Sequence, residues 1–242
     1  MKKNVVIFGA TSAIAYSIAK IYARQGANLY LVARHSERLA MLAQDLVARY
    51  CASVTTIVQD LNNVYEHEAL LKKIPDMDIA IIAHGTLSNQ FACQHDIDCL
   101  LTEYQTNCLS YLSLLTYLAN YFEACQKGSL VAITSVAGDR GRQSNYVYGS
   151  AKAAVSTFLS GLRGRLSKNN VQVLTVKPGF VDTPMVAHIK KNRLFAQPDQ
   201  VAKDIVGAIE CKKNVLYTPS FWRWIMLLIM LIPEGLFKKV RV

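Results

Sequence analysis

Residues 4–24, NVVIFGATSAIAYSIAKIYAR, determine the fold more than any other part of this chain of 242 residues. Residues 4–8 form a short run of strand-favouring side chains, and residues 12–24 place small and apolar side chains at helical spacing. Gly9 stands at the turn between them, so the segment is predicted to fold as a strand, a tight turn and a helix.

The same alternation continues along the chain. Because parallel strands need crossover connections, it predicts an α/β doubly wound fold, a parallel sheet of about seven strands with helices on both faces. Strands are predicted at residues 4–8, 28–33, 53–58, 78–83, 129–134, 171–176 and 214–218. Helices are predicted at residues 12–24, 37–50, 64–73, 98–124, 146–167 and 198–211. We expect residues 1–219 to form one domain and residues 220–242 to form its apolar, basic helical extension.

The composition excludes several classes of protein. Hydrophobic residues make up 52% of the chain and charged residues 18%, which excludes a disordered chain and predicts a large core. The six cysteines show no C-x-x-C spacing and are predicted to be reduced thiols. The strongly apolar part of the N-terminus, residues 5–8, is shorter than a secretory core, so we expect a cytoplasmic protein.

Two kinds of binding site are not expected. His84, Cys93, His95 and Cys99 form a cluster of metal-ligating residue types, but their spacing fits no zinc pattern. The formal net charge of +10 could indicate nucleic acid, but the chain has no recognition motif for it, and much of the charge lies beside an apolar tail. We therefore expect neither a metal nor a nucleic-acid partner.

The turn after the first strand has the small residues that a dinucleotide pyrophosphate requires. A turn that opens a helix presents backbone N–H groups and the positive end of the helix dipole. The spacing resembles Gly-x-x-x-Gly-x-Gly with alanine at the last two glycine positions, although a plain tight turn is the alternative. The predicted contacts are Gly9, Thr11, Ser12, Ala13 and Ile14.

Arg34 follows the second strand, where an acid would suit the ribose of NAD and a base suits the 2′-phosphate of NADP. We therefore predict NADP(H) in preference to NAD(H), the alternative being that Arg34 is a solvated surface charge. Asp60 and Leu61, after the third strand, are placed to reach the adenine. Further contacts along the cofactor are predicted after the fourth strand, from Ala83, His84 and Gly85.

Tyr148 and Lys152 stand four residues apart in a predicted helix, so their side chains share one face. An ammonium group beside a phenol is expected to lower the phenol's pKa, which would let Tyr148 exchange a proton with a carbonyl or alcohol. Ser135 ends the fifth strand, where its hydroxyl could hold the same oxygen. Asn107, in the long preceding helix, is placed to support a water chain to Lys152. Together these four residues predict a carbonyl reductase.

With these motifs in place, the chain resembles the short-chain dehydrogenase/reductase family over about residues 4–218. The resemblance implies a Rossmann-type fold, an NAD(P)-dependent oxidoreductase, and a homodimer or homotetramer. Residues 178–183, PGFVDT, resemble the family's Pro-Gly-x-Val-x-Thr, which holds the nicotinamide carboxamide. The corresponding residues are Pro178, Gly179, Val181 and Thr183. The chain departs from the family pattern at Ala13 and Ala15 in the turn, and at residues 83–85, where Asn-Ala-Gly is usual.

Three stretches, residues 135–152, 177–188 and 216–239, further resemble reductases that act on a keto group of a polyprenyl-phosphate-linked sugar. Such a substrate needs an apolar surface for its tail and cations for its phosphate. Residues 221–232, FWRWIMLLIMLI, supply the apolar surface, and six basic residues against one acidic residue lie between residues 212 and 241. The predicted substrate contacts are Arg140, Arg142, Trp222 and Trp224.

This resemblance implies a lipid-linked sugar substrate and a separate partner oxidase. We also expect residues 221–232 to contact the inner face of a membrane peripherally, since the apolar run is too short to span it. Three alternatives remain open at this point. The tail could be a dimer-interface helix with solvated arginines, the enzyme could reduce another lipid or small-molecule ketone, or the chain could be a non-enzymatic NADP-binding scaffold.

Overall fold

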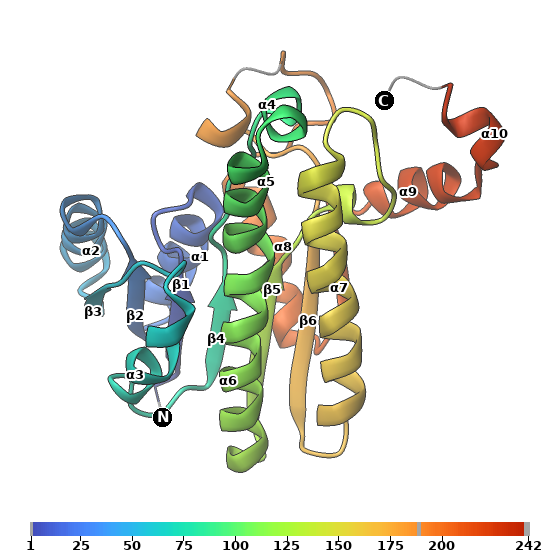
Figure 1. Cartoon of the computed structure of the whole chain (residues 1–242). Coiled ribbons are helices and arrows are strands. Elements are labelled where there is room, and N and C mark those ends of the chain that lie inside the picture. The colour runs from blue at the N-terminus through green and yellow to red at the C-terminus, as the bar shows by residue number, and fades with distance from the viewer. Residues whose placement is uncertain (1, 188–189, 240–242) are drawn as a thin grey trace.

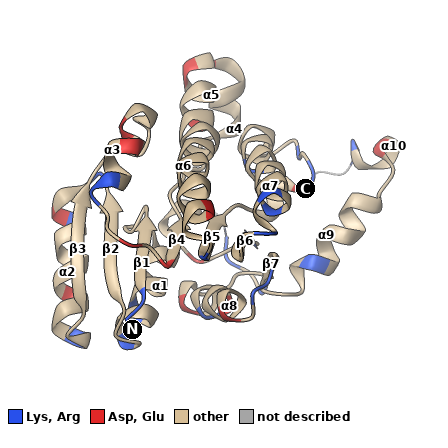
Figure 2. Ribbon diagram, turned by 90° about the horizontal axis from the view of Figure 1, so that it is seen from below, with Lys and Arg blue, Asp and Glu red and all other residues tan. Residues whose placement is uncertain are grey.

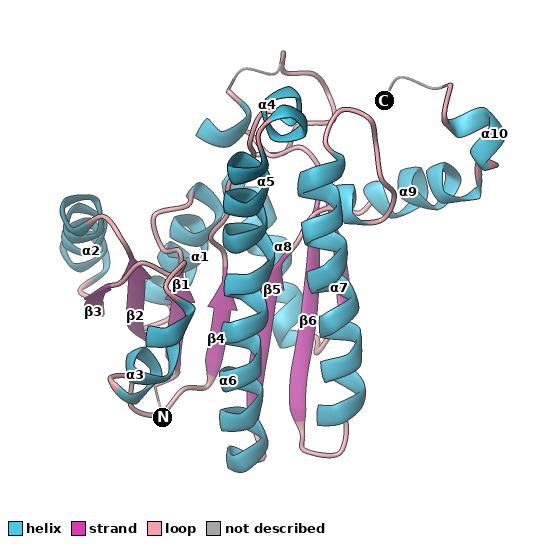
Figure 3. Ribbon diagram, viewed as in Figure 1, coloured by secondary structure: helices cyan, strands magenta, loops and turns pink. Residues whose placement is uncertain are grey.

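The computed structural model describes residues 2–187 and 190–239, and these residues form a parallel sheet of seven strands (Figure 3). The strand order is β3-β2-β1-β4-β5-β6-β7, and every neighbouring pair is parallel. The predicted fold class is therefore confirmed. The strands are β1 (Asn4–Phe8), β2 (Asn28–Ala33), β3 (Ser53–Val58), β4 (Ile79–Ile82), β5 (Gly128–Ile133), β6 (Val171–Pro178) and β7 (Val215–Thr218).

Helices cover both faces of the sheet (Figures 1 and 2). Parallel sheets are normally buried on both sides, which explains why the strands are almost continuously apolar. One face carries α1 (Ala13–Arg24), α2 (Ser36–Tyr50) and α8 (Pro198–Glu210). The other carries α3 (His67–Lys72), α6 (Ser110–Cys125) and α7 (Tyr146–Leu166).

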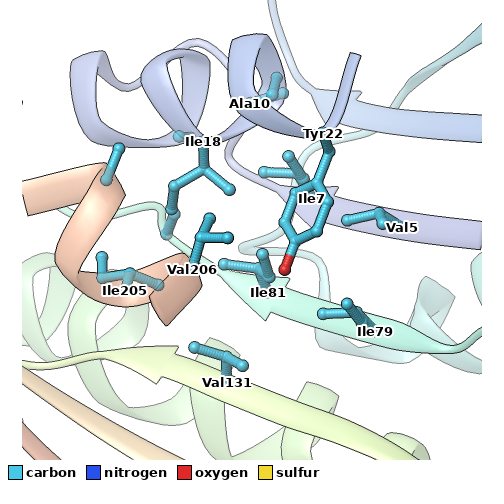
Figure 4. Close-up of a cluster of buried hydrophobic side chains, with 14 of the residues drawn as sticks. Val5, Ile7, Ala10, Ile18, Tyr22, Ile79, Ile81, Val131, Ile205 and Val206 are labelled. Carbon is cyan, nitrogen blue, oxygen red and sulfur yellow. The ribbon is translucent and has the colours of Figure 1, made fainter. Parts of the chain in front are cut away.

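The core is divided by the sheet into two clusters, because successive strand side chains point to opposite faces. In β1, Val5 and Ile7 belong to the cluster under α1 and α8, whereas Val6 and Phe8 belong to the cluster under α6 and α7. Figure 4 shows the first cluster, in which Ile18 of α1 lies near the side chains of β4 and α8. Burial on both faces fixes the register of the strands and hence the positions of their carboxyl ends.

The strand order reverses direction at β1, whose neighbours are β2 and β4. In open α/β sheets this switch point leaves a crevice at the carboxyl ends of the strands, where ligands bind. Gly9 makes the turn out of β1 with a φ of +79°. A Cβ there would lie 2.5 Å from the backbone nitrogen of His84, so only glycine allows the two segments to approach.

The long helix predicted at residues 98–124 is divided in the structure. A separate helix, α4 (Gln90–His95), precedes α5 (Ile97–Tyr104), and the side chains of Asn89 and Asp96 cap the two helices. Between α5 and α6 lies a π-helical segment, η2 (Gln105–Leu109). Short 3₁₀ turns complete the chain at η1 (Val64–Glu66), η3 (Val136–Gly138) and η4 (Pro184–Val186).

The C-terminal tail forms α9 (Trp222–Leu231) and, after Pro233, the short α10 (Glu234–Phe237). Both helices extend sideways from the β7 edge of the sheet (Figure 1), and α9 carries almost no charge along its length (Figure 2). Its inner face packs against Val136 through Trp222 and Met226. Within residues 2–187 and 190–239, no helix combines the length and the apolar character needed to cross a membrane.

Candidate active site

A cleft of about 460 Å³ opens at the carboxyl ends of the central strands. Every residue predicted for catalysis or cofactor binding lines it, although these residues come from loops spread over most of the chain. Of the predicted substrate residues, Arg142 and Trp222 also line the cleft, whereas Arg140 and Trp224 do not. The structure therefore brings together the turn after β1, the ends of β2 to β6 and the start of α7.

The N-terminus of α1 faces the cleft and is suited to a pyrophosphate. Ser12 caps the helix, accepting a hydrogen bond from the backbone nitrogen of Ala15 at 3.2 Å. Ala13 and Ile14 of the first turn line the cleft. Ala15, at the position of the last family glycine, is fully buried in the core, so its methyl group does not obstruct the cleft. The alanine at position 15 therefore takes no space from the cleft.

Basic side chains gather at the end of β2. The Arg34 Nε donates to the Nε2 of His35 at 3.1 Å, and Arg38 lines the same part of the cleft. Arg34 was predicted from the sequence, whereas His35 and Arg38 were not, because their proximity depends on how α2 begins. Two guanidinium groups at this position fit the 2′-phosphate of NADP.

The two segments that carry Ser135 and Tyr148 approach each other closely. A Cβ on Gly149 would lie 2.8 Å from the carbonyl oxygen of Ala137, so α7 is packed directly against η3. Ser135 hydrogen-bonds to Tyr148 as a result. The Nζ of Lys152 lies 5.8 Å from the centre of the Tyr148 ring and 4.2 Å from that of Tyr111. This geometry gathers a phenol, a hydroxyl and an amine at one point of the cleft.

The electrostatics of this pair differ from the expectation. Burial raises the pKa of Tyr148 to about 12, although the hydrogen bond from Ser135 lowers it in part, and the charge of Glu103 raises it further. The expected lowering of the Tyr148 pKa by Lys152 is therefore wrong for this arrangement. The reason is that burial also lowers the pKa of Lys152, to about 7, which weakens its positive charge near neutral pH.

Asn107 is held inside the π-helical segment η2, where its side chain is fully buried. Its Nδ2 donates to the carbonyl oxygen of Thr86 at 3.0 Å and to the Oε1 of Glu103 at 2.8 Å. The sequence analysis missed both partners. Thr86 lies in a loop whose position the sequence does not determine, and Glu103 lies on a helix where a charged residue is normally assumed to face water.

His84 forms part of the cleft wall between β4 and α6. The Ser110 hydroxyl donates to the carbonyl oxygen of Leu61 at 2.6 Å, so it accepts from the Nε2 of His84 at 2.8 Å. Burial, and then the nearby charge of Lys152, lower the pKa of His84 well below its ordinary value, so the ring is neutral. Where the family usually has Asn-Ala-Gly, this chain therefore has a neutral histidine that forms part of the cleft wall.

The four metal-ligating residue types singled out in the sequence have separate surroundings in the structure. Among the described residues, no group of three or more His, Cys, Asp or Glu side chains could hold a metal ion. Of the cluster considered above, Cys93 and Cys99 have their sulfur atoms 2.8 Å apart, whereas His84 faces Ser110 and His95 bonds to the backbone of Phe91.

The side chain of Arg140, from the loop that follows β5, contacts the C-terminal end of α9. One of its terminal nitrogens donates to the carbonyl oxygens of Ile229 and Ile232, the latter at 2.6 Å. Its guanidinium also stacks on the ring of Phe237 at 3.7 Å and pairs with Glu234. These contacts hold the tail against the loop that follows β5, so Arg140 has a role in anchoring α9.

Arg142, two residues further along, points into the cleft and is only 8% exposed. Its Nη2 contacts the sulfur of Met226 at 3.3 Å, and its Nε has no hydrogen-bond partner among the described residues. Trp222 lies over Gly179, with its indole Nε1 buried and likewise unpartnered there. Trp224, in contrast, is 64% exposed on the outer face of α9.

Comparisons with known proteins agree with this geometry. The family description "short chain dehydrogenase" matches residues 3–194. An uncharacterized oxidoreductase of Mycobacterium tuberculosis is 33% identical over 240 residues, which cover 98% of this chain and 96% of that protein. An uncharacterized oxidoreductase of Staphylococcus epidermidis is 28% identical over 219 residues, which cover 88% of this chain and 94% of that protein.

Two solved structures are also similar. A short-chain dehydrogenase from Sphingobium yanoikuyae in complex with NADPH is 26% identical, with a TM-score of 0.84 and coverage of 99% of this chain and 96% of that one. A short chain dehydrogenase from Burkholderia cenocepacia in complex with NADP shares the fold, with 18% identity, a TM-score of 0.86 and coverage of 100% and 98%. The chain belongs to the short-chain dehydrogenase/reductase family and is an oxidoreductase, as predicted.

Proposed function

We propose that this oxidoreductase uses NADPH to reduce a keto group on a polyprenyl-phosphate-linked sugar. The observation that carries the proposal is Arg142, a buried guanidinium on the cleft wall whose Nε lacks a partner among the described residues. Burying a charge without a carboxylate in contact is costly, so a bound anion would complete the site. A phosphate is suited to this position because guanidinium groups bind it with charge-assisted hydrogen bonds.

The cofactor preference for NADP(H) over NAD(H) is part of the proposal. It is supported by the basic cluster of Arg34, His35 and Arg38, and by the related structure from Sphingobium yanoikuyae, which is a complex with NADPH. Asp60 and Leu61 would border the adenine, and Ala83, His84 and Gly85 the middle of the cofactor. The nicotinamide end would be held by Pro178, Gly179, Val181 and Thr183.

Bound NADPH would supply the hydride that reduces the carbonyl carbon. Tyr148, whose phenol is protonated at neutral pH and whose pKa burial raises further, would donate a proton to the carbonyl oxygen. Ser135 would hold the same oxygen with its hydroxyl. Lys152 would bind the ribose and return a proton to Tyr148, and Asn107 would connect Lys152 to solvent.

The outer face of α9 suggests how a lipid-linked substrate would be reached. Trp224, Leu228 and Leu231 are each more than half exposed. Exposed apolar side chains on a helix followed by Lys238 and Lys239 are typical of a segment that lies on anionic lipid. We propose that α9 contacts the inner face of a membrane peripherally and that the protein is cytoplasmic. The inner face of the same helix, through Trp222, borders the cleft, so the lipid tail could leave along it.

Three sequence stretches support a lipid-linked sugar as the substrate, because they resemble decaprenylphosphoryl-2-keto-erythro-pentose reductase. Residues 135–152 contain Arg142, residues 216–239 contain α9, and residues 177–188 end at His188, which lies outside the described residues, as does Arg241 of the basic tail. Because the substrate is a ketone, a separate partner oxidase would supply it. We also propose residues 1–219 as the catalytic unit and 220–242 as its extension.

A homodimer or homotetramer is the proposed assembly. Large apolar side chains are exposed on α5, on the segment between α5 and α6, and at the start of α7, namely Leu101, Leu109 and Tyr146. Such residues are common in protein interfaces. Sizing with light scattering would test this proposal, and a monomer at micromolar concentration would contradict it.

The substrate proposal is tested by offering purified protein and NADPH three ketones. These are a polyprenyl-phosphoryl 2-keto-pentose, the same keto-sugar without the lipid phosphate, and a neutral lipid ketone. We expect turnover to be highest with the first. Higher turnover with the neutral ketone would replace the proposal by a general ketone reductase. Tight NADPH binding with no turnover of these ketones would contradict the proposed substrate and leave a reductase of another ketone.

A further inference from the structure

A buried glutamate lies beside the catalytic residues although it is not one of the four predicted for catalysis. Glu103 is on α5, one helical turn before Asn107, and only 1% of it is exposed. Burial of a carboxylate is costly unless hydrogen-bond donors replace its lost hydration. No cation among the described residues lies within ion-pair distance of Glu103. Its compensation must therefore come from hydrogen bonds and from more distant charge.

Three side chains contact the two carboxyl oxygens of Glu103. Its Oε1 accepts from the Asn107 amide at 2.8 Å, and its Oε2 accepts from the hydroxyls of Thr86, at 2.8 Å, and Ser88, at 2.5 Å. The Thr86 oxygen itself accepts from the Asn107 amide at 3.1 Å, so the Thr86 proton is free to point toward Glu103. Hydrogen-bonding groups thus contact both carboxyl oxygens and replace the hydration that burial removes.

The charge of Glu103, on α5, also affects the pKa of Lys152, on α7. The charge of Glu103 raises the pKa of Lys152, and the pKa would fall below about 7 without it, because desolvation lowers it. The titratable groups that face this network from the surrounding elements are Cys93 on α4, Cys108 on η2, Tyr111 on α6, His84 after β4, and Tyr148 and Lys152 on α7. Burial lowers the pKa of His84 well below its ordinary value, so Lys152 is the member of this set that carries a positive charge near neutral pH.

We propose that Glu103 is a positioning residue of the active site, whose carboxylate orients Asn107 and the loop at Thr86 and holds Lys152 in its ammonium form. The proposal deepens the function given above, since it depends on the roles of Lys152 and Tyr148 in carbonyl reduction. Glu103 thus supports the four catalytic residues from behind the cleft, with its charge balancing that of Lys152 inside the protein.

The test compares Glu103→Gln with Asp98→Asn, a matched variant that removes an exposed carboxylate from the same helix. Full-length protein carrying ¹³C at the lysine ε-carbon is titrated by NMR, with Lys152 assigned from a Lys152→Met sample. We expect the Lys152 midpoint to fall by about one pH unit in Glu103→Gln and to stay in place in Asp98→Asn. Glu103→Asp keeps the charge on a shorter side chain, so its Lys152 midpoint should stay close to the wild-type value.

An unchanged Lys152 midpoint in folded Glu103→Gln would overturn the proposal and leave Glu103 a purely structural residue. If Glu103→Gln does not fold, the carboxyl ¹³C signal of Glu103 in the unmodified protein decides, because a protonated carboxyl at neutral pH would equally overturn it. Neither measurement needs a ketone, so both remain valid if the proposed substrate is wrong. With a ketone that is turned over, the alkaline loss of reduction should also begin at lower pH in Glu103→Gln.

Discussion

Replacement of Arg142 by methionine should stabilise the protein and impair its function at the same time. The Arg142 guanidinium is 8% exposed, and its Nη2 contacts the sulfur of Met226 rather than a carboxylate. The nearby Asp139 is already engaged by Lys177 and by the Tyr217 hydroxyl, so it does not depend on Arg142. Burial lowers the pKa of Arg142, which expresses the cost of keeping its charge in this position.

The expected magnitudes follow from these contacts. Replacing a buried charge by an apolar side chain of similar volume stabilises proteins by about 1–4 kcal/mol in favourable cases. We take the lower end, about 1 kcal/mol, because Met226 already packs against the side chain, and this raises the Tm of a domain of this size by about 2–4 °C. Loss of hydrogen bonds between a guanidinium and a phosphate costs about 1.5–3 kcal/mol, or roughly 10- to 150-fold in kcat/KM.

The assay combines thermal unfolding with NADPH consumption. Wild-type protein, Arg142→Met and Arg142→Lys are compared on the polyprenyl-phosphoryl keto-sugar and on a neutral ketone. Arg142→Met should lose activity on the phosphate-bearing ketone alone, and Arg142→Lys should keep part of it, because a lysine retains the charge without the planar donor fork. A lower Tm combined with equal losses on both ketones would refute the reasoning, since Arg142 would then support the fold instead of the substrate.

Three further expectations follow from other contacts. The double variant Leu228→Asp/Leu231→Asp changes two exposed residues of α9. Flotation of the protein with anionic liposomes should be lost while its Tm is unchanged. Flotation equal to that of the wild type would contradict the membrane contact. Arg34→Ala should weaken NADPH binding about tenfold or more and leave NADH binding unaltered in titration calorimetry, whereas equal losses would argue against a 2′-phosphate site. Arg140→Ala removes the hydrogen bonds to the end of α9 and the stacking on Phe237. Hydrogen exchange of the α9 and α10 amides should therefore accelerate without a change in NADPH binding. Unchanged exchange would show that Arg140 does not anchor the tail.

The strands and the order of elements could be predicted because their patterns are local. Residues 4–8, 28–33 and 53–58 are short runs rich in strand-favouring residues, and the structure has β1, β2 and β3 with these same bounds. The helix α4 was missed because its start depends on the capping side chain of Asn89 rather than on apolar spacing. Most of the cleft residues were found because their motifs follow the carboxyl ends of strands, which the parallel fold brings to one edge, whereas Tyr148 and Lys152 were found from their four-residue spacing on α7.

The remainder of the site depends on contacts between distant segments. Arg140 was expected to meet substrate, but it binds the end of α9, which lies 89 residues further along the chain. Glu103 was not considered, because nothing in the sequence distinguishes a buried glutamate on a helix from an exposed one. The direction of the Tyr148 pKa shift was also mistaken, because four-residue spacing shows that Lys152 is near but does not show how deeply both are buried.

The most direct test of the account is a single-turnover measurement of NADPH oxidation by wild-type protein and Tyr148→Phe with the polyprenyl-phosphoryl 2-keto-pentose. The account predicts rapid oxidation by wild type and a loss of at least about 100-fold in the variant, because the phenol supplies the proton. NADPH should bind both proteins equally, since the substitution removes only a hydroxyl. Oxidation by Tyr148→Phe at the wild-type rate would contradict the assignment of Tyr148 as the acid.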